Sequence, residues 1–366
     1  MAVLAETLAE IRPADPRALA EARSHHDRLT KPRGSLGVLE DVAIRLAGAA
    51  GVSPPPMPEP AALAIFAADH GVHARGVSPW PQEVTVQMVA NFLAGGAVAN
   101  AFAAQAGVPV TVVDVGVATD LPEAPGLVNH KIGYGTADLS RGPAMTVDQA
   151  VQALEAGILV ARNLMATGAR CLITGDMGIG NTTASAALIS VFTGKDAAEV
   201  TGRGTGIDDA THERKVGIVR ESIRVNGLSG DLPTELASGL KAPSEALRAL
   251  AAVGGFEHAA IAGFILCGAA ARVPVILDGV IAGAAALVAA ALDPAVTDHC
   301  IAGHRSVEPG HSAALDQLGL RPLVDLELRL GEGTGGLLAH PMVCAAVRAL
   351  REVATFDSAG VTEKPV

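Results

Sequence analysis

Short apolar runs alternate with longer alanine-rich segments over most of the chain. The apolar runs have strand length and lie at 61–68, 109–115, 169–175, 272–277 and 322–328. The segments between them have helical length and lie at 82–106, 147–167, 180–193, 208–225, 243–252, 256–271 and 279–292. Because alternating strands and helices build parallel sheets covered on both faces, we expect an α/β fold with a mostly parallel sheet. Ligands of such sheets bind beyond the carboxyl ends of the strands.

The first part of the chain follows a different pattern. Residues 1–50 carry apolar positions at helical spacing, interrupted by a polar stretch around 31–35. The proline-rich segment 53–60 comes next and forms a stiff connector. We therefore expect a domain boundary near residue 60.

Composition narrows the class of protein. Hydrophobic residues make up 49% of the chain but aromatic residues only 2%, so Ala, Val, Leu and Ile must build the core. The net charge of −11 argues against a general nucleic-acid binder, which needs clustered Lys and Arg. The N-terminus lacks the basic and apolar regions of a signal peptide. The most apolar part, 259–292, is interrupted by Arg272, Pro274 and Asp278, so we expect no membrane span and a cytoplasmic protein.

Cysteine and histidine patterns give no support for a metal centre. The four cysteines lie far apart and form no CxxC pair, which argues against a disulfide framework or a zinc site. Two histidines and a glutamate in the segment 303–311 suggest metal ligands, but their spacing matches no known zinc pattern. We expect neither a metal nor a cofactor.

The segment 328–336, Leu-Arg-Leu-Gly-Glu-Gly-Thr-Gly-Gly, places one carboxylate among four glycines. Glycine allows positive φ and a close approach to a ligand, so this pattern predicts Glu332 on a tight turn facing flat substrate atoms. A solvated turn with an incidental glutamate is the other interpretation.

Two further glycine-rich segments predict anion binding. The first, 175–183, comes directly after an apolar run and precedes a helix, where backbone N–H groups and the helix dipole suit a phosphate or carboxylate. An ordinary helix capped by Asn181 or Thr182 is the alternative. In the second, 202–206, glycines flank Arg203 and a helix with Asp208 as a plausible cap follows. That helix carries Lys215, which either reaches a phosphate as a point charge or is solvated.

The segment 69–96 holds the only tryptophan of the chain, Trp80, between two prolines, followed by Gln87 and Met88. A tryptophan in a rigid loop at the end of a strand can form one wall of a slot for a planar ligand. A packing role is the alternative.

Taken together, these motifs resemble one family, the nicotinate-nucleotide–dimethylbenzimidazole phosphoribosyltransferases of the cobalamin lower-ligand pathway. The matching segments run in order through about 300 residues, which makes chance similarity untenable. They are KPRGSLG at 31–37, ADHGV at 68–72, PQEVTVQMV at 81–89, GDMGIGNTT at 175–183, GRGTG at 202–206, LDGVIAGAAAL at 277–287, GHRSVEPGH at 303–311 and LRLGEGTGG at 328–336.

The resemblance implies a homodimer with a two-domain subunit. It implies a large Rossmann-like domain over residues 61–339 and a small helical domain built from 1–60 and about 340–366. It further implies transfer of phosphoribosyl from nicotinate mononucleotide to 5,6-dimethylbenzimidazole, with inversion at C1′. The products would be α-ribazole 5′-phosphate and nicotinate.

The resemblance also assigns site residues. Glu332 matches the general base of the family. The azole slot would use Trp80, Gln87, Met88, Asp176 and Leu330. The phosphoribosyl and nicotinate groups would lie on Gly178, Ile179, Gly180, Asn181, Thr182, Arg203, Gly204, Thr205, Lys215 and Ser306.

Two positions depart from the usual family pattern. Asp176 stands where the family more often has Glu, and Trp80 where another aromatic such as Tyr is common. Both changes leave open a relative that uses a different acceptor, such as adenine, another benzimidazole or a phenol. A non-catalytic nucleotide or azole carrier is the alternative from another class. A nicotinamide dehydrogenase is disfavoured because no dinucleotide fingerprint follows the first strand.

Overall fold

A computed structural model describes residues 2–204, 206–228 and 243–362. Within these ranges the strands form one parallel sheet of six strands in the order β3-β2-β1-β4-β5-β6. The strands are β1 (Ala61–Ala68), β2 (Val110–Gly116), β3 (Leu127–Asn129), β4 (Cys171–Met177), β5 (Val275–Leu277) and β6 (Cys300–Ala302). This order reverses between β1 and β4, and such a switch point is where open α/β sheets bind ligands.

Alternating residues of β1 explain how the sheet is buried on both faces. Ala62, Ala64 and Phe66 point into one apolar core, and Leu63 and Ile65 point into the other. All eight residues of β1 are buried. A strand buried on both sides has a continuous apolar run instead of alternation, and that is the pattern at 61–68.

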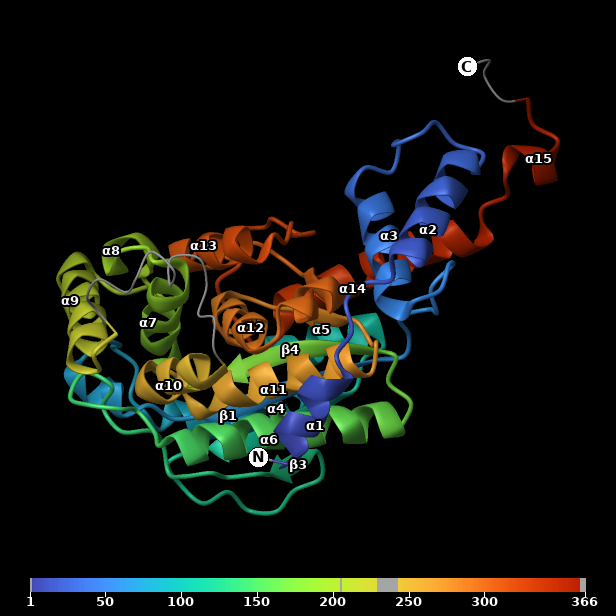
Figure 1. Ribbon diagram of the computed structural model, residues 1–366. Coiled ribbons are helices and arrows are strands. Elements are labelled where there is room, and N and C mark those ends of the chain that lie inside the picture. Colours follow the sequence, from blue (N-terminus) through green and yellow to red (C-terminus); the bar gives the residue numbers. More distant parts are fainter. Residues whose placement is uncertain (1, 205, 229–242, 363–366) are drawn as a thin grey trace.

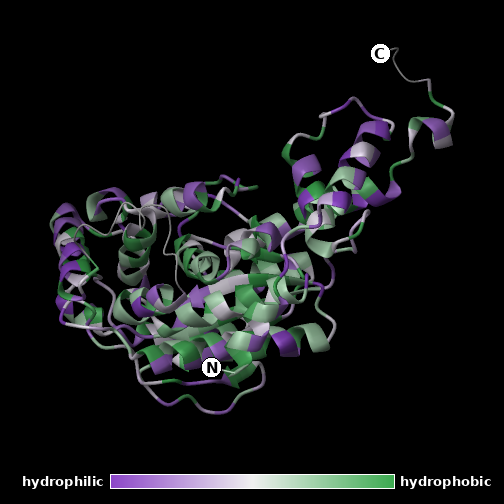
Figure 2. Cartoon of the chain, viewed as in Figure 1, coloured by the Kyte–Doolittle hydropathy of each residue, from purple (hydrophilic) through white to green (hydrophobic). Residues whose placement is uncertain are grey.

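Helices cover both faces (Figure 1). One face carries α6 (Val147–Ala166), α7 (Asn181–Thr193), α10 (Pro243–Val253), α11 (Phe256–Ala270) and α12 (Val280–Leu292), with α9 (Asp209–Val225) packed outside α7. The other face carries α4 (Val84–Leu93), α5 (Val98–Ala106) and α14 (Thr334–Glu352). Figure 2 shows the hydrophobic ribbon concentrated around the sheet, while α9 at the periphery is mixed with hydrophilic positions. The predicted α/β fold is confirmed.

Two helices from the early part of the chain and the long helix near its end form a group that projects from the body of the molecule (Figure 1). Here α2 (Pro16–Arg28) packs on α3 (Val38–Ala50), and both contact α14. The first helix, α1 (Ala2–Glu10), packs instead on α6 and α11 of the body. The division of the chain at residue 60, with completion by 340–366, stays a prediction, and residues 363–366 lie outside the described ranges.

The apolar pattern predicted four of the six strands and was wrong at 322–328. That segment forms no strand and contributes only an isolated bridge between Val324 and His304, because Asp325 and Glu327 interrupt it and Glu327 has a φ of +58°. The edge strands β3 and β6 were missed, because neither lies within an apolar run of strand length, whereas the equally short β5 does.

The predicted helix 82–106 is in fact two helices, α4 and α5. Gly95, with a φ of +77°, and Gly96 separate them. By length and composition alone Val84–Ala106 would suffice to cross a membrane. Its two halves instead pack on the strands and on α14.

Candidate active site

A cavity lies at the carboxyl ends of β4 and β5. Segments 176–182, 203–204, 279–281 and 329–332 line it, together with Lys215, Ser306 and Glu308. These segments come from three predicted glycine-rich regions, so the fold gathers motifs that are up to about 150 residues apart in the chain.

Glu332 enters this cavity from a strained turn. Its φ is +63°, and its neighbours Gly331 and Gly333 have φ values of +84° and +87°. The left-handed conformation costs a non-glycine residue about 1–2 kcal/mol, so the surrounding contacts must hold the turn in place. The side chain is buried, and its Oε2 accepts a 3.3 Å hydrogen bond from the backbone N–H of Ala99 on α5. Burial raises the pKa of Glu332, and the charge of Asp278 raises it further, while the Ala99 N–H opposes both effects.

Asp176 lies at the end of β4, beside the same turn. Its Oδ2 accepts a 3.0 Å hydrogen bond from Nδ2 of Asn181, and a Cβ atom at Gly331 would lie 3.2 Å from its carboxylate oxygens. Burial, aided by the charges of Asp278, Glu257 and Glu332, raises the pKa of Asp176 well above its ordinary value. Its Oδ1 is buried and has no hydrogen-bond partner. Asp176 thus places a second buried carboxyl group, whose pKa is also raised, next to Glu332.

The segment 178–182 packs tightly against β1 before α7 begins. A Cβ atom at Gly178 would lie 2.3 Å from the carbonyl oxygen of Ala68, so only glycine fits there. The residue that caps α7 is Gly180, with a φ of +96° and no side chain to occupy the first N–H groups of the helix. The alternative of a cap by Asn181 or Thr182 is therefore wrong. The start of α7 keeps the features of an anion site.

Lys215 reaches the same cavity from α9 and is 1% exposed. Its Nζ donates to Oγ1 of Thr182 at 2.8 Å and to the carbonyl oxygen of Gly202 at 3.2 Å. Burial lowers the pKa of Lys215 to about 8, and the charge of Glu308 partly opposes this. The predicted cap of α9 is confirmed, because the Asp208 carboxylate accepts the Thr211 N–H at 2.8 Å.

Glu308 is a functional candidate that the motif analysis missed as a site residue. It is buried, lines the cavity, and its Oε1 accepts the N–H of Gly204 at 2.7 Å. A Cβ atom at Gly202 would collide with its carboxylate at 2.0 Å, which explains one glycine of the segment 202–206. A buried glutamate in a loop just before a helix, within a motif of the family, was the available signal.

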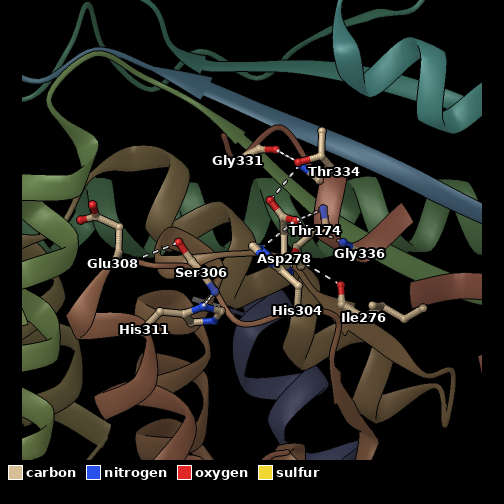
Figure 3. A network of polar contacts seen from close by, with 12 residues as sticks. Thr174, Ile276, Asp278, His304, Ser306, Glu308, His311, Gly331, Thr334 and Gly336 are labelled. Carbon is tan, nitrogen blue, oxygen red and sulfur yellow. Dashed lines mark hydrogen bonds and ion pairs between the residues drawn. The ribbon is translucent and has the colours of Figure 1, made fainter. Parts of the chain in front are cut away.

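Figure 3 shows polar contacts at the cavity, where Glu308, Ser306 and His311 form one hydrogen-bonded group. The N–H of Glu308 donates to Oγ of Ser306, whose own N–H donates to Nδ1 of His311 at 3.0 Å. Burial lowers the pKa of His311 to about 3, with His304 and Arg305 adding to the effect. His311 is therefore a neutral acceptor that fixes the loop carrying Ser306 and Glu308.

Most of the predicted site residues line the cavity. They are Asp176, Gly178, Ile179, Gly180, Asn181, Thr182, Arg203, Gly204, Lys215, Ser306, Leu330 and Glu332. Three residues of the predicted azole slot do not line it: Trp80 is 49% exposed, Gln87 is exposed, and Met88 packs on the core beneath α4. Thr205 lies outside the described residues. The cavity also takes in Val77, Ser78, Gly279 and Arg329, which sequence reasoning did not select.

One cluster of buried side chains lies outside this cavity. His70 Nε2 is 2.6 Å and His258 Nδ1 is 2.9 Å from Oε1 of Glu257, and Ser185 Oγ is 2.8 Å from His258 Nε2. The donor atoms of His70, Glu257 and His258 lie within 4.8 Å of one another, a spacing that a metal ion could bridge. Since the three side chains already pair with one another, the cluster is explained as a hydrogen-bonded network between β1, α7 and α11.

A parallel sheet with a switch-point cavity, a buried carboxylate on a glycine turn and a glycine loop at the start of a helix are typical of an α/β enzyme that acts on a small molecule. Comparison with known proteins makes this specific. A family model described as Phosphoribosyltransferase matches residues 11–361. The chain is 59% identical to the nicotinate-nucleotide–dimethylbenzimidazole phosphoribosyltransferase of Salinispora tropica, covering 99% of this chain and all of that protein. It is 50% identical to the protein of that name from Chloroflexus aggregans, covering 100% and 99%.

Solved structures indicate the same family. The crystal structure of the enzyme of that name from Thermus thermophilus superposes with a TM-score of 0.86 at 47% identity, covering 96% of this chain and 100% of that chain. The chain therefore belongs to the nicotinate-nucleotide–dimethylbenzimidazole phosphoribosyltransferase family, and it is a pentosyl-transferring enzyme.

Proposed function

We propose that this enzyme transfers the phosphoribosyl group of nicotinate mononucleotide to 5,6-dimethylbenzimidazole, with inversion at C1′. The products are nicotinate and α-ribazole 5′-phosphate, which serves assembly of the cobalamin nucleotide loop. The relatives named above support the choice of substrates. The observation that carries the proposal is one cavity whose lining includes a buried carboxylate, Glu332, the glycine loop 178–182 and Lys215.

Glu332 suits the role of general base. Benzimidazole must lose its N–H proton when its other ring nitrogen is glycosylated, and the carboxylate of Glu332 accepts this proton. Because burial raises its pKa, Glu332 is a stronger base than a solvated glutamate. The bond from C1′ to the pyridine nitrogen breaks and the bond to the benzimidazole nitrogen forms on the opposite face, so the configuration changes from β to α. Nicotinate leaves as a neutral pyridine and needs no acid.

The other end of the cavity binds the phosphoribosyl group. The phosphate lies at the start of α7, beside the backbone of 178–182, and Lys215 supplies a compensating positive charge. Two N–H groups of this loop are already engaged, since Ile179 donates to Oγ1 of Thr85 and Asn181 donates to the carbonyl oxygen of Gly178. Arg203, Gly204 and Ser306 belong to the same end. The carboxylate of Glu308 would repel the donor phosphate, because both groups are negatively charged. It is instead suited to accept hydrogen bonds from the ribose hydroxyls. Positioning and stabilisation of an oxocarbenium-like state supply most of the remaining catalysis.

The acceptor end combines Glu332, Asp176 and Leu330. Leu330 is half exposed at the rim, where it offers an apolar contact for the benzimidazole methyl groups. Trp80, Gln87 and Met88 stay predictions as further contacts. Asp176 in place of the more common Glu withdraws the carboxyl group by one methylene, which leaves room for a different acceptor. A competition assay between azole and phenol acceptors shows whether the enzyme prefers 5,6-dimethylbenzimidazole or a different acceptor.

The test is a chromatographic assay of purified enzyme with nicotinate mononucleotide and 5,6-dimethylbenzimidazole, with product configuration assigned by NMR. We expect nicotinate and the α-configured ribazole phosphate. Glu332→Gln should lower kcat by roughly 10²- to 10⁴-fold, the usual contribution of a general base, with donor binding retained. Glu6→Gln, an exposed change on α1, is the matched control. Undiminished turnover in Glu332→Gln would remove Glu332 from this role, and donor binding without turnover by any acceptor would favour a carrier.

We also propose that the enzyme is a cytoplasmic homodimer. The family resemblance supports both statements. Sedimentation of the purified chain and fractionation of cells test them, and a monomer at all concentrations would contradict the first.

A further inference from the structure

The motif Leu277–Leu287 resembles the family but has no role in the chemistry described above. Its second residue, Asp278, comes directly after β5 and is fully buried. Figure 3 shows its carboxylate lying between the end of β5 and the first turn of α14. This position is directly beside the turn that carries Glu332.

The carboxylate of Asp278 accepts three backbone hydrogen bonds from that turn. Oδ2 accepts the N–H of Gly333 at 3.0 Å, and Oδ1 accepts the N–H groups of Gly335 and Gly336 at 2.7 and 3.1 Å. Gly333 is the residue that follows Glu332 and, like it, has a positive φ. An acidic side chain at the start of a helix also interacts favourably with the helix dipole. Asp278 thus holds the backbone on the C-terminal side of Glu332.

Asp278 is itself held rigidly. Its N–H donates to Oγ1 of Thr174 on β4 at 3.0 Å, and that hydroxyl lies 3.4 Å from the carbonyl oxygen of Ile276. His304 Nε2 lies 3.6 Å from Oδ1 of Asp278, beyond hydrogen-bonding distance. The contacts therefore run from the sheet through Thr174 and Asp278 to the Glu332 turn.

We propose that Asp278 is a positioning residue that holds Glu332 in its strained turn and acts on the Glu332 carboxyl through its negative charge. This inference rests on the proposed role of Glu332 as the base. Among the described residues, the side chains of Asp176 at the end of β4 and His304 after β6 face the same region, while the N–H of Ala99 approaches from α5. Arg329, in the same loop as Glu332, reaches instead toward the carbonyl oxygen of Gly204.

The charge of Asp278 gives the proposal a distinctive signature. A negative neighbour disfavours ionisation of a carboxyl group, so it raises the pKa of Glu332. Removing that charge lowers the pKa of Glu332. The acid limb of kcat/KM, where activity is lost as the base becomes protonated, then moves to lower pH. A role in positioning alone, which leaves the burial of Glu332 unchanged, would not move this limb.

The test compares Asp278→Asn and Thr174→Val in the same assay over a range of pH. Asp278→Asn removes the charge and at least one acceptor, so we expect kcat to fall by roughly 10- to 100-fold, the effect of a small misplacement of a catalytic group. We expect the acid limb to shift to lower pH and KM for nicotinate mononucleotide to stay within about threefold of the parent enzyme. Thr174→Val loosens Asp278 but keeps its charge, so kcat should fall while the acid limb stays in place.

The matched control is Asp114→Asn at the end of β2. Asp114 is also fully buried and accepts two backbone hydrogen bonds, from Gly116 and Val117 at 3.1 and 2.9 Å, but it lies away from the cavity lining. If Asp114→Asn shifts the acid limb as much as Asp278→Asn, the shift reflects a loosened fold and the proposal fails. All variants are assayed with the same substrates. Protonation of the azole therefore affects every pH profile equally and does not contribute to the differences between them.

Circular dichroism and thermal unfolding establish which variants fold. If Asp278→Asn does not fold, Thr174→Val decides: a fall in kcat at constant donor KM supports the proposal, and an unchanged kcat overturns it. A folded Asp278→Asn with unchanged kcat and acid limb overturns it as well. Glu332→Gln distinguishes this failure from that of the proposed function. If Glu332→Gln is inactive and Asp278→Asn is normal, only the role of Asp278 is wrong. If Glu332→Gln is active, the base itself is wrong.

Discussion

The buried ammonium group of Lys215 leads to a prediction of how the binding of nicotinate mononucleotide depends on pH. Its ammonium group is almost fully buried, and burial lowers the pKa of Lys215 to about 8 in the free enzyme. On the proposed mechanism only the protonated form attracts the donor phosphate. Donor affinity is therefore full below pH 8 and is lost as the pH rises through 8.

The magnitude follows from the fraction of enzyme that is competent to bind. The apparent dissociation constant increases by the reciprocal of the protonated fraction, which is about twofold at pH 8 and about tenfold at pH 9. The phosphate has its second pKa near 6, so it stays a dianion over this range and adds no dependence of its own. One pH unit above the pKa thus weakens binding by about 1.4 kcal/mol.

The measurement is KM for nicotinate mononucleotide between pH 6.5 and about 9.5 at saturating 5,6-dimethylbenzimidazole, supported by calorimetric titration of the donor. Lys215→Arg keeps a charge at every pH and should remove the rise in KM, even where its altered shape weakens binding overall. Lys215→Met should bind the donor weakly at every pH. Lys195→Met, which removes an exposed lysine at the end of α7, is the control and should retain the parent profile.

A donor KM that stays constant from pH 6.5 to 9.5 in the parent enzyme would refute this reasoning. Either Lys215 would then remain charged despite its burial, or the phosphate would lie elsewhere. Parallel profiles for the parent and Lys215→Met would identify the second case.

Two further predictions concern the walls of the site. Gly178→Ala places a methyl group 2.3 Å from the carbonyl oxygen of Ala68, so it should lower stability by about 1–3 kcal/mol and raise the donor KM. Gly217→Ala, which meets open space on α9, should instead raise the thermal unfolding midpoint slightly. Trp80→Ala should raise KM for the acceptor without changing KM for the donor, because Trp80 is half exposed and contributes little to the core. A large loss of stability with both KM values unchanged would assign Trp80 to packing.

The sheet was predictable because its central strands are buried on both faces. A run such as 61–68 must be continuously apolar, and its boundaries coincide with β1. The edge of the sheet was not predictable in this way. The segment 322–328 has enough apolar residues for a strand, but it forms only an isolated bridge, between Val324 and His304, directly after β6. An apolar run in the sequence identifies a segment that is buried. Whether that segment becomes a strand depends on its backbone pairing with strands far away in the chain.

The residues of the proposed anion end could be found in the sequence from short motifs, because glycines at the start of a helix cluster where the backbone itself can face a ligand. The acceptor end could not be completed in the same way. Trp80, Gln87 and Met88 lie on a segment whose motif matches the family, yet the described cavity does not include them. A slot for a planar ligand depends on where several loops meet, and the amino-acid pattern of one loop does not determine that meeting point.

The two carboxylates that sequence reasoning did not select, Asp278 and Glu308, share a physical property. Each is buried and accepts backbone N–H groups from a glycine-rich loop that belongs to another part of the chain. A glycine-rich loop lacks side chains to fix its own shape, so a distant acid must supply the contacts that hold it. The glycines are visible in the sequence because they cluster, whereas the acid that holds them is a single residue up to about 100 positions away. In this fold two of the three glycine-rich segments, 202–206 and 328–336, are each held by a buried carboxylate from elsewhere in the chain, and only the tertiary structure reveals which one it is.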